Sequence, residues 1–186
     1  MKSSYQQNNY DELFSALVAV HKPKVIVECG VLNGFSLLAM VESSDPRSDI
    51  FAYDLFEDYE FKHGQQKEVQ NLLDVNFHKN VKLVKQDAIE AARNHEDKSV
   101  DFLHIDISNH YENLAKMFDV WMPKVKVDGL MLFEGGSKER DNVEWMKKHK
   151  KRKISKFIYE YLVDCYMFEF VTMLPFPSLT ICRKLE

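Results

Sequence analysis

Short runs rich in β-branched residues alternate with amphipathic segments along most of this 186-residue chain. Two parallel strands need a long crossover connection, which is usually a helix, so this alternation predicts a parallel sheet with helices on its faces. We expect strands at 24–28, 49–54, 81–85, 100–106 and 130–133. We expect helices at 10–21, 35–42, 65–77 and 87–94, and another from Asn109 to Pro123.

The C-terminal part predicts further helices and a hairpin. One helix is expected around Arg140 to His149, and apolar residues at 154, 157, 158, 161, 162 and 165 have the spacing of a second. Runs at 168–174 and 179–183, joined through two prolines, suit an antiparallel pair. We therefore predict an α/β three-layer sandwich whose seven-stranded, mostly parallel sheet closes with this hairpin. The length fits a single domain, 1–186.

Two local signals refine these boundaries. Asn109, followed by Glu112 three residues later, has the pattern of a capping box at a helix start. Asp128 and Gly129 predict a turn before the strand at 130–133.

Composition excludes several classes of protein. A net charge of −4 argues against a nucleic-acid binder with a broad basic face. The basic run Lys147–Lys153 is most simply a solvated helix end and loop, with an acidic partner as the alternative. No stretch approaches the ~20 apolar residues of a membrane span, and the N-terminus has no apolar leader. Three scattered cysteines favour reduced thiols in a cytoplasmic protein. The composition does not decide between a monomer and a homo-oligomer.

Acidic residues follow five successive predicted strands. They are Glu28, Asp54, Asp87, Asp106 and Glu134. Ligands of open parallel sheets bind outside the carboxyl ends of the strands, so these acids predict one binding site at that edge.

The turn after the first strand reads Glu28-Cys29-Gly30-Val31-Leu32-Asn33-Gly34. Gly30 and Gly34 let the backbone turn sharply beside a ligand, and Ser36 adds a hydroxyl in the first turn of the next helix. Leu32 stands where a dinucleotide motif has its second glycine. Glu28 would repel a diphosphate but would bind an ammonium group, and the alternative is a plain strand-to-helix turn.

Two further strand ends suit a nucleoside. Asp54, next to Leu55, lies about twenty residues after the glycine turn, where a carboxylate can accept hydrogen bonds from a ribose diol. Asp87, next to Ala88, could bind an exocyclic adenine amine. For each acid the alternative is an ordinary helix N-cap.

Asp106 and His110 are the candidate catalytic residues. Asp106 could orient a substrate or hold a metal ion, and neutral His110 could act as a general base. His110 also shares a helical stripe with apolar residues, so a packing role is the alternative, and His104 within the strand is expected to be structural. Glu134 could complete an oxygen-ligand site with Asp106, but two carboxylates do not establish a metal, so no metal ligand is assigned.

Together these motifs resemble the class I S-adenosylmethionine-dependent methyltransferases, which have a Rossmann-like fold. The loop from Glu28 to Gly34 matches the acidic-x-Gly-x-x-x-Gly motif of that family, Asp54 its ribose-binding acid, and Gln86-Asp87-Ala88 its adenine-contacting segment. The run from Val100 to Asp106, followed by His110-Tyr111-Glu112, resembles the small-molecule O-methyltransferase group with an Asp-x-x-x-His-Tyr-Glu stretch.

The chain departs from that group at two places. Ile107-Ser108-Asn109 replaces the usual Gly-Asp, and Glu134 stands where metal-dependent members carry aspartates. The resemblance implies S-adenosyl-L-methionine as cofactor, bound by Glu28, Gly30, Gly34, Ser36, Asp54, Leu55, Asp87, Ala88 and Asp106. It also implies methylation of a small polar acceptor on oxygen, with His110 and Asp106 as catalytic residues and a divalent metal left open.

Three alternatives remain. A catalytically altered S-adenosylmethionine-binding protein would explain the changed 107–109 segment. An NAD-dependent oxidoreductase would use the same sheet edge and the same Asp54, although the missing middle glycine counts against it. A nucleic-acid methyltransferase would have to rely on the Lys147–Lys153 run.

Overall fold

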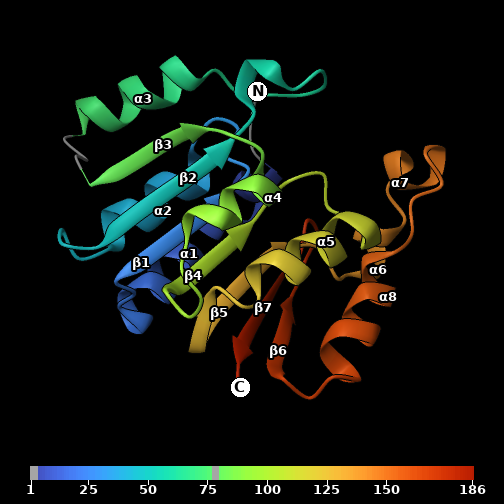
Figure 1. Cartoon of the computed structure of the whole chain (residues 1–186). Coiled ribbons are helices and arrows are strands. Elements are labelled where there is room, and N and C mark those ends of the chain that lie inside the picture. Colours follow the sequence, from blue (N-terminus) through green and yellow to red (C-terminus); the bar gives the residue numbers. More distant parts are fainter. Residues whose placement is uncertain (1–3, 77–79) are drawn as a thin grey trace. The chain divides into compact units, whose positions relative to one another are not determined.

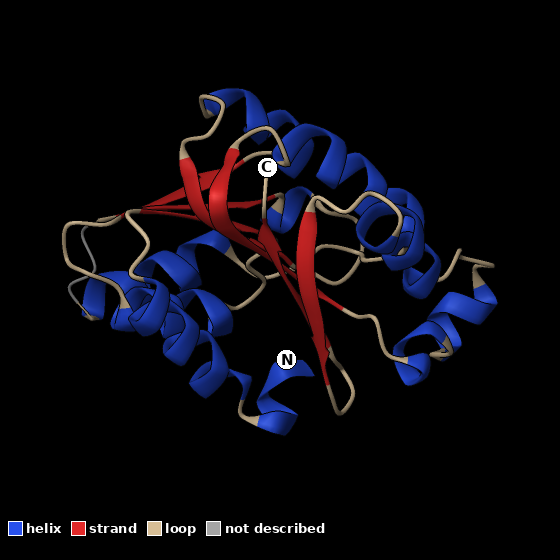
Figure 2. Cartoon of the chain, turned by 90° about the horizontal axis from the view of Figure 1, so that it is seen from below, coloured by secondary structure: helices blue, strands red, loops and turns tan. Residues whose placement is uncertain are grey.

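The computed structural model describes residues 4–76 and 80–186 (Figure 1). The predicted helix end at Phe77 and the polar start at 1–3 lie outside the described residues. The chain divides into two compact units, residues 1–91 and 92–186, and each is described by itself. Helices lie on both sides of the strands (Figure 2).

The first unit is built on three parallel strands in the order β3-β2-β1. Val25 pairs with Asp49, and Ile50 pairs with Val81, so the three carboxyl ends lie at one edge. Its elements are η1 (Ser4–Asn8), α1 (Tyr10–His21), β1 (Val25–Cys29), α2 (Phe35–Ser43), β2 (Asp49–Asp54), η2 (Phe56–Asp58), α3 (Gln66–Val75), β3 (Val81–Lys85) and α4 (Ala88–Ala91).

Burial distinguishes β1 from the other two strands of this unit. Ile26, Val27, Glu28 and Cys29 are all fully buried, as expected for a strand covered on both faces. Helices α1 and α2 pack against each other behind the strands in Figure 1, and Phe14 of α1 is fully buried. The buried acid at position 28 is therefore held in a rigid part of the unit.

The second unit contains four strands in the order β4-β5-β7-β6. Strand β5 runs parallel to β4 and antiparallel to β7, and β6 and β7 form the predicted hairpin. Its elements are η3 (Ala92–Asn94), β4 (Val100–Ile105), α5 (Tyr111–Trp121), β5 (Val125–Glu134), α6 (Lys138–Asp141), α7 (Glu144–Lys148), α8 (Ile154–Ile158), the π-helix η4 (Tyr159–Val163), β6 (Phe168–Met173) and β7 (Leu179–Lys184).

Aromatic packing holds the helices of the second unit to its strands. Phe118 of α5 contacts Phe133 of β5 and Phe157 of α8, edge to face, with ring centroids 5.8 and 4.8 Å apart. Phe133 and Phe157 also contact each other at 5.6 Å, so the three rings form one buried cluster. This cluster fixes the end of β5, where Glu134 follows.

Three local predictions in the second unit are wrong, and the helix expected at 154–165 is present with a change of geometry. Asp128 and Gly129 lie inside β5, where the register with β4 shifts after Val100, so they form a bulge rather than a turn. The helix expected at 140–149 is two short helices, α6 and α7, and that expected at 154–165 changes from α to π geometry at Tyr159.

The third wrong prediction is the capping box. His110, not Asn109, is the N-cap residue of α5, and no side chain caps that end. The Asn109 amide instead donates to the backbone oxygens of Ile105 and Glu134, both at 3.1 Å. These long-range bonds compete with the local one that the sequence pattern suggests.

Candidate functional site

The glycine turn of the first unit adopts backbone angles that few side chains tolerate. Gly30 and Gly34 have φ values of +90° and +77°, and Leu32 between them has +52°. Gly30 N donates to Tyr53 O at 2.8 Å, and Gly34 N donates to Val31 O at 2.9 Å. The loop therefore folds back on itself before α2 begins, as the two glycines predict.

Asp54 anchors this loop through its carboxylate. Oδ2 accepts from the backbone N–H groups of Val31 and Leu32, at 2.6 and 3.0 Å, and Oδ1 accepts from Phe56 N at 2.7 Å. A carboxylate has about four acceptor positions, so these three bonds leave about one, on Oδ1, for a ribose hydroxyl. Asp54 thus has a structural role that the strand-end pattern did not reveal.

Glu28 and Ser36 form a buried pair at the other side of the turn. Ser36 Oγ donates to Glu28 Oε1 at 2.5 Å, and the two residues are 5% and 0% exposed. The hydroxyl orients a carboxylate that is shielded from water, where it would attract an ammonium group strongly. The predicted residues 28 and 36 are therefore brought together.

Asp87 caps α4, so the alternative prediction of an ordinary helix N-cap holds for this residue. Its Oδ1 accepts from Ile89 N and Glu90 N at 2.8 and 3.2 Å, and the side chain is exposed. Ala88 beside it is buried. The pKa of the Cys29 thiol in β1 is raised, first by burial, then by the charge of Glu28 and then by that of Asp87. Asp87 therefore acts electrostatically on β1.

Gly64 is a residue of this site that no sequence motif indicates. It is buried, and a Cβ atom at this position would lie 1.7 Å from Leu32 O. The segment before α3 therefore closes directly over the glycine loop, and only glycine allows this approach.

In the second unit, Asp106 follows the last residue of β4 and is half-buried. His104, two residues earlier, is fully buried within that strand beside Leu132, in line with its structural assignment.

His110 is buried and hydrogen-bonded, with its Nδ1 2.6 Å from Glu112 Oε2. The pKa of Glu112 is lowered: burial acts to raise it, but bonds from its own backbone N–H and from His110 outweigh that effect. An ionised carboxylate only accepts, so Nδ1 carries the proton and Nε2 is the acceptor nitrogen of the ring. Burial lowers the pKa of His110 below its ordinary 6.5, and Glu112 opposes this. His110 is therefore neutral at pH 7.

Glu134, the last residue of β5, forms an ion pair with Arg140 of α6. Arg140 Nε donates to Glu134 Oε1 at 2.9 Å, and both side chains are close to nine-tenths buried. Arg140 could not be predicted as a site residue, because an arginine on a short helix belongs to no motif. The basic run Lys147–Lys153 is mainly exposed. Within it, Arg152 stacks on the Tyr111 ring, with Cζ 3.4 Å from the ring centroid.

Comparison with known proteins identifies the class. A methyltransferase-domain family model matches residues 27–134, and the chain belongs to that family. The class I S-adenosylmethionine-dependent methyltransferase predicted from the sequence is therefore confirmed, and with it the cofactor of the class. An uncharacterised protein of Sinorhizobium fredii, y4gI, is 29% identical over 123 residues, which are 63% of this chain and 14% of that protein. The chain thus spans only about a seventh of that relative.

Solved structures share the fold. A methyltransferase from Geobacter sulfurreducens has a TM-score of 0.70 at 14% identity, over 95% of this chain and 78% of that one. The SAH-bound methyltransferase PaMTH1 of Podospora anserina has a TM-score of 0.76 at 16% identity, over 100% and 80%. A SAM-dependent O-methyltransferase from Thermotoga maritima has 0.65 at 13% identity, over 96% and 66%. The predicted seven-stranded Rossmann-like fold with a closing antiparallel hairpin is confirmed.

No helix in residues 4–76 and 80–186 is long and apolar enough to cross a membrane.

Proposed function

We propose that this chain transfers the methyl group of S-adenosylmethionine to an oxygen atom of a small polar acceptor. The family match supports methyl transfer, and the buried Glu28–Ser36 pair beside the glycine turn carries the cofactor assignment. We also propose that residues 1–186 act as a single domain, because the family match at 27–134 extends across the boundary between the two units.

The residues of the first unit fit the cofactor by their chemistry. A buried carboxylate at Glu28 suits the ammonium group of the methionine moiety, and the turn at Gly30 and Gly34 brings backbone close to a ligand. The remaining acceptor position of Asp54 suits a ribose hydroxyl, with Leu55 beside it. Asp87, Ala88 and Asp106 are proposed as further cofactor contacts.

The sulfonium of the bound cofactor supplies an activated methyl group, so the protein has mainly to position the acceptor and remove its proton. His110 is our candidate base: the Glu112 carboxylate fixes its tautomer and leaves Nε2 to accept a proton. Nε2 of His110 would take the proton of the acceptor hydroxyl. The bound S-adenosylmethionine would supply the methyl group to the acceptor oxygen, with its S–CH3 bond broken and S-adenosylhomocysteine as the leaving group. Asp106 is proposed to orient the acceptor.

Radiolabelled methyl transfer to fractionated small-molecule extracts tests this proposal. We expect label in an oxygen-methylated product, and we expect His110→Ala and Asp106→Asn to lose most of this activity while binding cofactor normally. Asp49→Asn, an exposed acid at the start of β2, is the matched control. Normal turnover by both variants would refute the assigned roles.

The changed 107–109 segment favours one other candidate, an S-adenosylmethionine-binding protein that has lost catalysis. That candidate predicts cofactor binding without label transfer to any fraction.

A further inference from the structure

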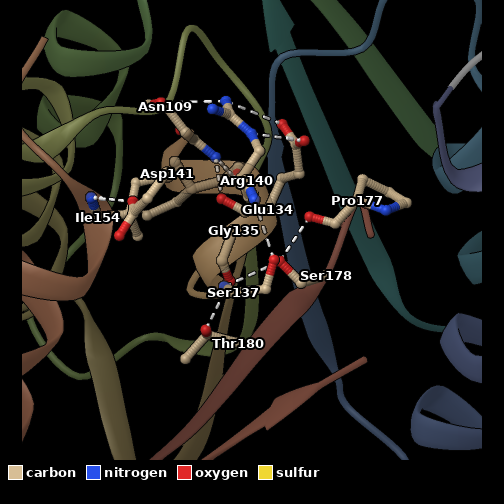
Figure 3. Close-up of polar contacts among 11 residues, drawn as sticks. Asn109, Glu134, Gly135, Ser137, Arg140, Asp141, Ile154, Pro177, Ser178 and Thr180 are labelled. Carbon is tan, nitrogen blue, oxygen red and sulfur yellow. Dashed lines mark hydrogen bonds and ion pairs between the residues drawn. The ribbon is translucent and has the colours of Figure 1, made fainter. Parts of the chain in front are cut away.

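The pairing of Glu134 with Arg140 bears on the role of metal in this enzyme. Figure 3 shows the guanidinium facing the carboxylate, with Nε 2.9 Å from Oε1 and Nη2 3.5 Å from Oε2. The side chains of Arg140 and Glu134 are 9% and 12% exposed. Both carboxylate oxygens are thus turned toward one buried cation.

Asn109 joins this pair to a third segment of the chain. Arg140 Nη2 donates to Asn109 O at 3.1 Å (Figure 3). The Asn109 amide donates to the backbone oxygens of Ile105 and Glu134. The Asn109 side chain therefore connects the ends of β4 and β5, and the Arg140 guanidinium connects Asn109 to α6. A helix cap at Ser137, whose Oγ accepts from Arg140 N at 3.1 Å, fixes the arginine backbone.

This arrangement does not fit a divalent cation. A hard cation needs several carboxylate or carbonyl oxygens around it, and each oxygen of Glu134 already faces the guanidinium of Arg140, whose positive charge repels a second cation. The guanidinium is a cation, so a positive charge lies directly beside the Glu134 carboxylate. Within the part of the chain that the structure describes, no three His, Cys, Asp or Glu side chains are grouped so that they could hold a metal.

One part of the guanidinium is not used by the cluster. Arg140 Nη1 is buried and has no hydrogen-bond partner among the described residues. An orphaned buried donor is costly, so a role confined to tying the segments together does not account for it.

We infer that Arg140, and not a divalent cation, supplies the positive charge beside Glu134, so that methyl transfer by this chain needs no divalent metal. The inference rests on the proposed function. The Arg140 guanidinium lies against the Glu134 carboxylate, where a bound cation would have to lie. Arg140 orients Glu134 and Asn109, and its Nη1 is the donor left for the oxygen of the methyl acceptor.

Manganese binding tests the inference without any acceptor. The chain is stripped with a chelator, saturated with S-adenosylhomocysteine and titrated with Mn²⁺, and free Mn²⁺ is followed by its paramagnetic resonance signal. We expect Mn²⁺ to stay free at submillimolar concentration, with no difference between the wild type and Glu134→Gln. One equivalent bound by the wild type and by Glu169→Gln, an exposed control, but lost in Glu134→Gln would overturn the inference.

The methylation assay supplies a second readout. We expect the methylation rate with a chelator to stay within about twofold of the rate without it. We expect Arg140→Gln to lower it at least tenfold with the cofactor KM unchanged, and Arg140→Lys to restore part of it because the charge is kept. Loss of the rate with chelator and its recovery with Mg²⁺ would refute metal independence, even where Arg140 variants fail to fold. Absence of S-adenosylhomocysteine binding, measured separately, would instead refute the proposed function.

Discussion

Replacing Asp54 by asparagine should destabilise the first unit by loosening the glycine loop. The carboxylate accepts three backbone N–H bonds, from Val31 at 2.6 Å, Leu32 at 3.0 Å and Phe56 at 2.7 Å. Asparagine has a single carbonyl oxygen, which can face the loop or Phe56 but not both, and its NH₂ group then faces another donor.

The size of the effect follows from those bonds. A hydrogen bond to a charged group contributes roughly 1.5–3 kcal/mol, and a neutral one about 1 kcal/mol. At least one bond is lost and the others become neutral, while the half-buried position screens part of the charge. We expect the free energy of unfolding to fall by about 2 kcal/mol.

Urea unfolding followed by circular dichroism measures this change. Asp49→Asn, at the exposed start of the same strand, is the control and should stay within about 0.5 kcal/mol of the wild type. If Asp54→Asn also stays within about 0.5 kcal/mol, the carboxylate does not anchor the loop and the reasoning is wrong.

Three further predictions concern other parts of the molecule. Gly64→Ala should weaken S-adenosylhomocysteine binding at least tenfold in calorimetry, because its Cβ would lie 1.7 Å from Leu32 O; an unchanged affinity would mean that the loop yields freely. The pKa of His110, followed by NMR, should lie below 6.5. Between that lowered pKa and 6.5 the unfolded chain binds more protons than the folded one, so the free energy of unfolding should fall as pH falls through this window. His110→Asn should remove the share of this pH dependence that His110 contributes. The same pH dependence in the wild type and the variant would contradict the lowered pKa. Arg140→Met should cost about 3–5 kcal/mol by leaving Glu134 buried without its cation, whereas the double variant with Glu134→Leu should recover most of the loss; additive losses in urea unfolding would refute the coupling.

The sequence predicted well those elements whose pattern is local. Helix α1 and strands β2 and β3 begin and end at the predicted residues, because apolar periodicity and a following proline or turn define them. The errors occur where distant segments decide the structure. Asn109 bonds to the ends of β4 and β5 rather than capping α5, and no local pattern reports such bonds.

The candidate site divides in the same way. Strand-end position predicts that Glu28 and Asp54 lie at one edge, and the parallel pairing of β1 with β2 brings the two strand ends together there. It could not show that the Asp54 carboxylate holds backbone amides of the loop. Nor could it find Arg140, whose significance comes from its contact with Glu134.

Titration calorimetry with S-adenosylhomocysteine, and in parallel with NAD, tests the central claim most directly. We predict one site per chain for S-adenosylhomocysteine and none for NAD. Glu28→Gln should weaken binding at least tenfold, while Glu42→Gln, an exposed acid on α2, should leave it unchanged. Micromolar binding of NAD without binding of S-adenosylhomocysteine would contradict the account.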